Sequence, residues 1–130
     1  MTTKISYAIA FLTGLGLIFL GARFLFSPEV AEAGFGIHFN EQGDYSFHYM
    51  KGIRDILSGL LMCVFVLMNE RHALGVTLLV GTMVPVTDML IVLSKSYNSL
   101  LQAVPHIIAI IICSIFGIIL LLTKPSKKIP

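Results

Sequence analysis

Residues 105–122 read PHIIAIIICSIFGIILLL, an apolar run that contains no Asp, Glu, Lys or Arg. A helix needs about 20 mostly apolar residues to cross a bilayer. Because backbone polar groups in lipid must be satisfied within their own segment, this run predicts a transmembrane helix over about residues 102–123. Three further apolar runs predict helices over about residues 5–26, 49–69 and 73–94. Together they predict an all-α fold, a four-helix transmembrane bundle that forms a single domain over residues 1–130.

The composition of the 130-residue chain supports this prediction. Only 12% of the residues are charged and 56% are hydrophobic, whereas soluble domains carry about 25% charged residues. A soluble domain of this size exposes much of its chain to water and could not bury so much apolar surface. We therefore expect the lipid bilayer to be the main partner, and apolar helix faces are also compatible with a homo-oligomer. The net charge of +2 gives no reason to expect nucleic-acid binding.

The connection between the first two predicted spans, residues 27–48, is much longer than the other two. A long first extramembrane loop of this kind is typical of a lid, a short surface helix or a flexible tether. A signal peptide cleaved after Ala33 is the alternative, and the length of the first apolar run argues against it.

Basic residues gather on the side of the bundle opposite to this loop, at Lys4, Arg71, Lys124, Lys127 and Lys128. Cytoplasmic loops of membrane proteins are enriched in Lys and Arg. We therefore expect an integral, multi-pass membrane protein with both termini in the cytoplasm, although Lys51 and Lys95 lie on the other side.

Six ionisable residues lie within the predicted spans or at their edges, where a charged side chain costs about 2.5–3.5 kcal/mol. A helix rises 1.5 Å per residue, so the ionisable residues inside the spans are expected about 5–10 Å below the non-cytoplasmic surface of the membrane. They come from all four spans. The six residues are Arg23, Lys51, Arg54, Asp55, Asp88 and His106. We expect them to form one ligand-binding level on the inward faces of the helices.

Two interpretations of this level stay open. In the first, Arg54, Asp55 and Asp88 form a buried ion-pair network that only fixes the register of the helices. In the second, the same groups line a pocket that opens to the outer side, where Asp88 and His106 could anchor a ligand or act as a catalytic base and acid.

Small residues accompany the polar ones at helical spacing, and such residues let membrane helices approach closely. The expected close-packing positions are Gly14, Gly16, Gly21, Gly52 and Gly59. Two inward stripes are expected as well, through Thr77, Gly81, Val84 and Asp88 and through His106, Ile110, Cys113 and Gly117. Pro85 removes a helical hydrogen bond and is expected to kink the third span.

No metal or cofactor site is expected. Cys63 and Cys113 lie in apolar runs and are interpreted as packing residues. His38, His48 and His72 are expected to be solvated, and a metal site built from His38, Glu41 and His48 would match no known ligand spacing.

The segment YMKGIRDILSGLL, residues 49–61, resembles the entry to the second helix in the DUF4267 family of small four-helix membrane proteins. The likeness extends over nearly the whole chain, through an aspartate late in the third helix, a histidine that opens the fourth, and an arginine near the end of the first. The matching positions are Arg23, Pro28, Gly34, Gly36, Gly52, Arg54, Asp55, Asp88 and His106. The resemblance implies the four-helix architecture and the shared polar level, and it implies no activity.

Three functions follow as hypotheses, and whether the chain is an enzyme stays open. The leading one is a membrane protein that binds a small or lipid-like molecule against Arg54, Asp55, Asp88 and His106. The second is a small membrane enzyme, such as an isomerase, that uses Asp88 and His106 on a lipophilic substrate. The third is a small dimeric transporter, which is disfavoured because the first span contains no acidic residue.

Overall fold

The computed structural model describes residues 2–38 and 42–124, which form six helices and no strand. In chain order these are α1 Thr2–Phe26, α2 Pro28–Phe35, α3 Ser46–Leu67, α4 Arg71–Gly81, α5 Met83–Leu93 and α6 Leu100–Leu122. Within the described ranges three stretches are long and apolar enough to cross a membrane: Thr2–Phe26, Arg71–Leu93 and Leu100–Leu122. The chain is therefore an all-helical, integral membrane protein.

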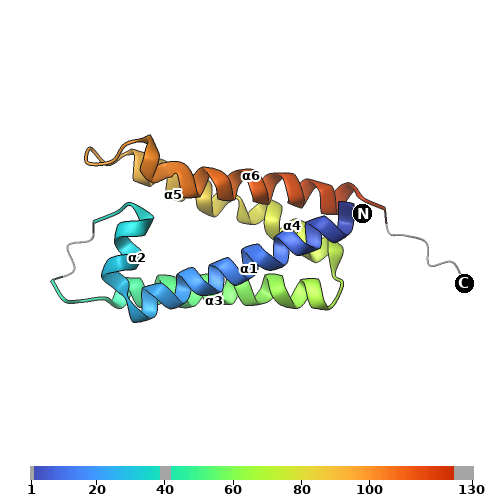
Figure 1. The fold of residues 1–130 in the computed structure, drawn as a ribbon, viewed down its shortest axis with the longest axis horizontal. Helices are drawn as coiled ribbons and strands as arrows, with labels where there is room; N and C mark the ends of the chain where they lie inside the picture. The colour runs from blue at the N-terminus through green and yellow to red at the C-terminus, as the bar shows by residue number, and fades with distance from the viewer. Residues whose placement is uncertain (1, 39–41, 125–130) are drawn as a thin grey trace, which may run out of the picture.

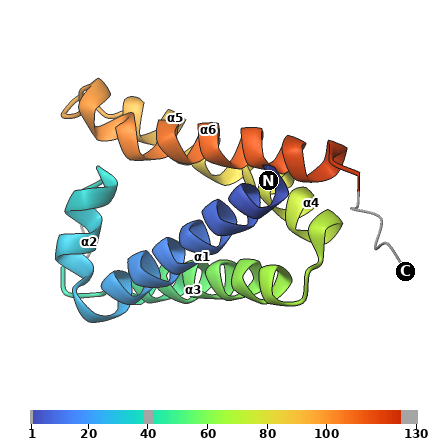
Figure 2. The ribbon, with the colours of Figure 1, turned by 45° about the vertical axis from the view of Figure 1, so that its right-hand side comes forward.

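The long helices form two antiparallel pairs (Figure 1). In one pair α1 packs along α3, and in the other α4 and α5 both pack on α6. The two pairs converge at the end where α1 begins and α6 finishes, and they separate towards the opposite end, where α2 lies between them (Figure 2). The structure therefore has a closed end and an open end, and α2 fills part of the open one.

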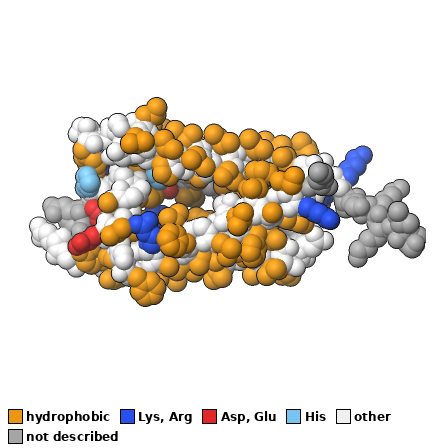
Figure 3. Space-filling view, in the orientation of Figure 1, with side chains coloured by type: hydrophobic (Ala, Val, Ile, Leu, Met, Phe, Trp, Pro, Cys, Tyr) orange, Lys and Arg blue, Asp and Glu red, His pale blue; other side chains and the backbone are white. Residues whose placement is uncertain are grey.

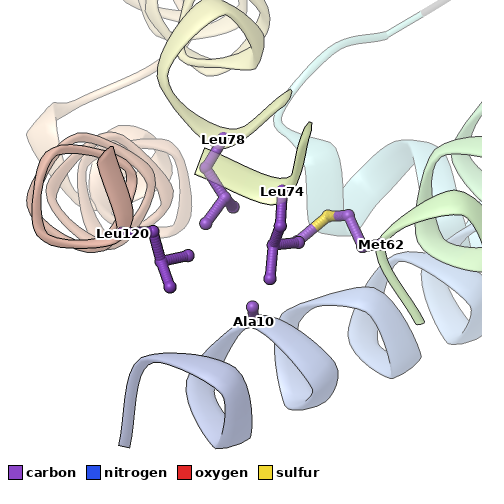
Figure 4. Packing of buried hydrophobic residues seen from close by; sticks show 5 residues of the cluster. All are labelled: Ala10, Met62, Leu74, Leu78 and Leu120. Atoms are coloured by element: carbon purple, nitrogen blue, oxygen red, sulfur yellow. The ribbon is translucent and has the colours of Figure 1, made fainter. Parts of the chain in front are cut away.

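The closed end is held by a small apolar core to which four helices contribute (Figure 4). Its buried residues are Ala10, Met62, Leu74, Leu78 and Leu120. The small Ala10 side chain lets α1 approach the leucines of α4 and α6 closely. Beside this core, Arg71 Nη1 donates a hydrogen bond of 2.8 Å to the carbonyl oxygen of Leu120, which satisfies an acceptor at the C-terminal end of α6.

Glycines bring α1 and α3 into backbone contact at two levels. Gly14 lies against Gly59, and Gly21 lies against Gly52. A Cβ atom on Gly14 would lie only 2.8 Å from the carbonyl oxygen of Gly59, and one on Gly52 would lie 2.8 Å from that of Gly21. Gly16 is different, because a Cβ atom there would meet nothing within 4 Å. Four of the five expected glycines are therefore close-packing positions, and Gly16 is not.

The expected kink of the third apolar stretch lies one turn before Pro85. α4 ends at Gly81 and α5 begins at Met83, so the interruption is at Thr82. Gly81 is four residues before Pro85, and its carbonyl is the group that loses a donor and meets the proline ring. Of the stripe expected here, Val84 is 60% exposed. The buried face runs instead through Leu74, Leu78 and Val92.

The region expected to be one long loop is partly helical. Eight of its residues form α2, which starts with Pro28 in its first turn, and α3 begins at Ser46 rather than near Tyr49. Just before α3, the Asp44 carboxylate accepts hydrogen bonds from the side chain and the backbone N–H of Ser46. These two bonds hold the pKa of Asp44 below its ordinary value. Of the alternatives for this region, the short helix is therefore the one observed.

A matched pair of substitutions on α1 tests the glycine contact. Gly14→Ala places a methyl group against the backbone of α3 and is expected to lower the free energy of unfolding by about 1–3 kcal/mol. Gly16→Ala adds the same methyl group in open space and is expected to leave stability unchanged or slightly raised. Thermal unfolding of both variants in mild detergent measures the difference, and equal midpoints would contradict the close approach of α1 and α3.

Candidate functional site

The open end of the structure contains a group of ionisable side chains, here called the polar layer. Its members come from four helices and are Glu32, His48, Lys51, Asp55, Asp88 and His106. Within α3, Lys51 and Asp55 are one turn apart, and Lys51 Nζ lies 2.9 Å from Asp55 Oδ2. Both side chains are largely removed from solvent, with 20% and 17% of their surface exposed. This ion pair compensates a carboxylate that is largely removed from solvent.

The Lys51 ammonium group also lies over two aromatic rings. Its Nζ atom is 5.0 Å from the ring centroid of Phe24 on α1 and 4.8 Å from that of Phe35 on α2. A cation over a ring face is attracted by the negative charge on that face, and the attraction strengthens where water is excluded. Lys51 therefore joins three helices, because α3 supplies the cation and α1 and α2 supply its apolar partners.

A second polar pair fixes α2 against α3. His48 Nε2 and Glu32 Oε2 are 2.8 Å apart, and both residues are buried. The ring of His48 also contacts the rings of Phe24 and Tyr45. The first turn of α3 is thus anchored to the middle of α2 by a hydrogen bond that has little contact with solvent.

The C-terminal end of α2 contacts the helix pair formed by α4 and α5 with α6. His106 on α6 is buried, its Nε2 atom donates a 3.1 Å hydrogen bond to the carbonyl oxygen of Phe35, and the two rings meet edge to face at 4.8 Å. Gly36 then ends α2 with a φ of 92°, a left-handed conformation that glycine adopts without strain. The side-chain amide of Asn98 donates to the carbonyl oxygens of both Gly36 and Val92. Phe35 consequently contacts Lys51 on one side and His106 on the other.

Asp88 on α5 completes the polar layer. Lys51, Asp55 and His106 lie close enough to Asp88 to interact with it electrostatically. The side chain is half-buried. Within residues 2–38 and 42–124, no hydrogen bond or ion pair is made to its oxygens. Asp88 is therefore a carboxylate with free acceptor positions among groups that are already hydrogen-bonded or ion-paired.

The surface of the structure is hollowed in two places. On the face drawn in Figure 3, a recess opens between the two helix pairs, with acidic and histidine side chains inside it, a basic side chain at its edge and hydrophobic side chains along both pairs. A second, shallow hollow of about 340 Å³ lies at the corner of α1 and α2, lined by residues 25–30 with Tyr45 and Tyr49. None of the residues of the polar layer lines the second hollow.

Two of the predicted site residues lie elsewhere. Arg54 is exposed on α3, and Arg23 is half-buried with its guanidinium 5.8 Å from the ring of Phe19. The expected ion-pair network of Arg54 with Asp55 and Asp88 was therefore wrong. The reason is helical geometry, because Lys51 is one turn from Asp55 on the same face whereas Arg54 is its neighbour in sequence and turns away. The structure brings together the other four predicted residues, Lys51, Asp55, Asp88 and His106.

Sequence reasoning missed Glu32 and His48, and the expectation that His48 is solvated was wrong. The signal was present, because His48, Lys51 and Asp55 follow one another at helical spacing, but it becomes visible only once α3 begins at Ser46. His38 and His72 are exposed, as expected. Glu41, a member of the metal site considered from the sequence, lies outside the described residues. Within the described ranges no cluster of His, Cys, Asp and Glu could hold a metal ion.

Comparison with known proteins gives one match. The sequence model of a family described as "Domain of unknown function (DUF4267)" matches residues 14–120. This range contains every residue of the polar layer and both glycine contacts. No curated protein and no solved structure matches the chain.

The role of Lys51 can be tested against its neighbour. Lys51→Met removes the partner of Asp55 and the cation between two rings, and leaving a largely buried carboxylate unpaired is expected to cost about 1–3 kcal/mol of stability. Arg54→Met removes the same charge three residues later, from an exposed position, and is expected to have little effect. The midpoints of thermal unfolding in detergent compare the two, and a larger loss for Arg54→Met would refute the assignment of Lys51.

Proposed function

The chain belongs to the DUF4267 family, and we propose that it is a four-span membrane protein that binds a small or lipid-like ligand at its polar layer. The observation that carries the proposal is the Asp88 carboxylate. It lies among charges from α3 and α6, and no described residue forms a hydrogen bond or ion pair with it. A half-buried acid without a bonded partner is a costly arrangement at membrane depth, and such residues mark binding or transport sites.

In this proposal α3 is the fourth membrane-spanning helix. Its 22 residues are enough to cross a bilayer, and only its three charged residues, Lys51, Arg54 and Asp55, set it apart from the three apolar stretches. Close contact between α1 and α3 at both glycine levels supports a shared path through the membrane. The charge of Lys51 and Asp55 is compensated within the pair, which lowers the cost of burying them.

We further propose that the closed end faces the cytoplasm, together with both termini. Lys4 and Arg71 lie at that end, as does Lys124 after α6. Because cytoplasmic segments are enriched in Lys and Arg, this distribution supports an inward closed end and an outward open end with α2.

Binding is favoured over catalysis by the state of His106. An acid–base enzyme acting on a lipophilic substrate, such as an isomerase, could use Asp88 and His106, and their electrostatic proximity supports this second candidate. The Nε2 atom of His106, however, is held by the carbonyl oxygen of Phe35, and the ring is buried. A buried histidine whose Nε2 atom is hydrogen-bonded to the backbone is better suited to positioning α2 than to exchanging a proton with a substrate.

Cysteine labelling tests the four-span topology. In a background with Cys63→Ala and Cys113→Ala, Val30→Cys on α2 and Glu70→Cys after α3 both place a thiol at an exposed position. A membrane-impermeant maleimide added to intact cells is expected to label Val30→Cys alone, and Glu70→Cys only after permeabilisation. Labelling of both thiols from the same side would contradict a membrane-spanning α3.

Native mass spectrometry tests ligand binding. The unaltered protein, extracted from membranes in mild detergent, is expected to carry a non-covalent adduct, and Asp88→Asn is expected to lose it because the amide cannot provide the carboxylate charge. Glu70→Gln makes the same chemical change at an exposed position and serves as the control.

The Asp88→Asn variant must retain its helical circular dichroism for this comparison. If it carries the same adduct as the unaltered protein and the control, or if none of the three carries one, the proposed function is wrong. A loss of adduct confined to Asp88→Asn supports binding at the polar layer.

A further inference from the structure

We propose that the hollow at the corner of α1 and α2 binds a trimethylammonium group, the cation that choline and phosphatidylcholine carry. This site is separate from the polar layer, because none of the residues that line it belongs to that layer. The inference therefore goes beyond the proposed function. It is carried by the size of the hollow, by the aromatic and acidic residues of its lining, and by a hydrogen bond that connects two of them.

The hollow lies where the last turn of α1, the first turn of α2 and the start of α3 meet (Figure 1). Its volume of about 340 Å³ is near the lower end of the range for small-molecule sites, so it suits a head group better than a whole amphiphile. The backbone of the corner is fixed through Ser27, whose N–H donates to the carbonyl oxygen of Arg23 and whose carbonyl oxygen accepts from the N–H of Ala31. The walls of the hollow are therefore present before a ligand binds.

Three aromatic residues line the hollow, namely Phe26 on α1 and Tyr45 and Tyr49 at the start of α3. The rings of Tyr45 and Tyr49 have centroids 6.5 Å apart and planes inclined by 49°, so they are not stacked flat on each other. Phe26 is 85% exposed and Tyr49 is 47% exposed, so both keep surface for a ligand. Aromatic faces attract cations, and groups of aromatic rings are the common recognition sites for quaternary ammonium ions.

The charge of the lining favours a cation. Glu29 is the one charged residue in it, because residues 25–30, Tyr45 and Tyr49 include no Lys, Arg or His. Two helix ends also meet here, and their partial charges oppose each other, since the C-terminal end of α1 is negative and the N-terminal end of α2 is positive. The carboxylate of Glu29 consequently sets the sign of the hollow, and Asp44, next to Tyr45 in the chain, adds a second acid at its edge.

The basic residues nearest to the lining in sequence do not cancel this charge. The guanidinium of Arg23 lies 5.8 Å from the ring centroid of Phe19, one turn back along α1 and therefore away from the corner. On α3, His48 and Lys51 are each paired with a carboxylate of the polar layer. A cation in the hollow thus meets the acid of Glu29 without a competing base from the lining.

A hydrogen bond holds the acid and one ring in place. The Tyr45 hydroxyl donates to Glu29 Oε1, which connects the start of α3 to the first turn of α2. A hydrogen bond to a carboxylate is stronger than one between neutral groups. Because the two side chains are already ordered, a ligand that binds between them loses less free energy to their immobilisation.

The lining suits a trimethylammonium group better than a primary ammonium group. A primary ammonium has three N–H donors that need acceptors, whereas Glu29 Oε1 already accepts from Tyr45 and the side chains of Leu25, Pro28 and Val30 are apolar. A trimethylammonium group has no donor to satisfy, and its methyl groups gain apolar contact beside the rings. In the proposed four-span arrangement the hollow lies at the outer end of α1, where lipid head groups lie. A choline lipid and a soluble choline compound are therefore the two sources of this group.

Two lipids that differ only in the head group test the inference. The protein in dodecyl maltoside is mixed with equal amounts of phosphatidylcholine and phosphatidylethanolamine with identical acyl chains, and the bound lipids are counted by native mass spectrometry. Phosphatidylcholine adducts are expected to be about three- to tenfold more abundant, which corresponds to one or two cation–π contacts. The known masses of the two lipids distinguish them from a ligand of the polar layer, so the preference is expected to persist in Asp88→Asn.

Matched variants connect the preference to the hollow. Tyr49→Leu removes a ring but keeps an apolar side chain, and it is expected to bring the ratio of the two lipids close to one. Phe19→Leu removes an exposed ring of α1 outside the hollow and is expected to leave the ratio unchanged. Glu29→Gln keeps an acceptor for Tyr45 but removes the charge, and it is expected to lower phosphatidylcholine binding about threefold, whereas Glu70→Gln is expected to have no effect.

The outcomes separate this inference from the proposed function. Equal binding of the two lipids, a preference for phosphatidylethanolamine, or a preference that neither Tyr49→Leu nor Glu29→Gln changes would overturn it, even if an adduct that depends on Asp88 is found. Loss of the phosphatidylcholine adduct in an excess of choline chloride would show that the head group alone is recognised, and its retention would assign the site to the lipid. If Tyr49→Leu does not fold, Glu29→Gln still decides whether the hollow is the site.

Discussion

The burial of the Lys51 ammonium group is the constraint on which the open end of the structure depends. A cation that is largely removed from solvent must be compensated, and here one carboxylate and two phenyl rings compensate it. The carboxylate belongs to the same helix, so the pair marks one face of α3, and the contacts of Lys51 with Phe24 and Phe35 show that this face turns towards α1 and α2. The rings belong to Phe24 and Phe35, so Lys51 holds α3 against the last turn of α1 and against α2. Phe35 also contacts His106 on α6, so the same ring connects Lys51 to the second helix pair.

The two ends of the bundle are built by different interactions, and this division explains how a small protein can be both stable and open. At the closed end, apolar contacts around Leu74 and the close approach of Gly14 to Gly59 join the helices, and a hydrogen bond from Arg71 to the carbonyl oxygen of Leu120 adds to them. At the other end the pairs separate, and hydrogen bonds and charges replace apolar contact. α2 bridges this gap only in part, and Asp88 on α5 stays half-buried without a hydrogen bond to a described residue. The proposed binding at the polar layer follows from that incomplete closure.

Sequence reasoning reached the helical membrane fold and the family, and four residues of the polar layer, because runs of apolar residues and ionisable groups among them are directly visible. It failed where the outcome depended on details of helix phase and start. Arg54 was expected in an ion-pair network with Asp55, but Lys51 is the residue that pairs with this carboxylate. His48 was lost because α3 begins earlier than its apolar run suggests. Glu32 could not be found in this way, since its burial depends on α2 folding back between the pairs. The aromatic partners Phe24 and Phe35 gave no signal, because phenylalanine is ordinary in membrane helices.

The central claim is that α2 lies between the helix pairs and brings Phe35 into contact with both Lys51 and His106. Magic-angle-spinning NMR of the uniformly labelled protein in lipid bilayers measures this directly, with no substitution. The account predicts carbon–carbon correlations from the Phe35 ring to the His106 ring, whose centroids are 4.8 Å apart, and from the same ring to the side-chain carbons of Lys51. Spectra that show the contact of Lys51 with Asp55 within α3, but no correlation from Phe35 to either α3 or α6, would contradict it.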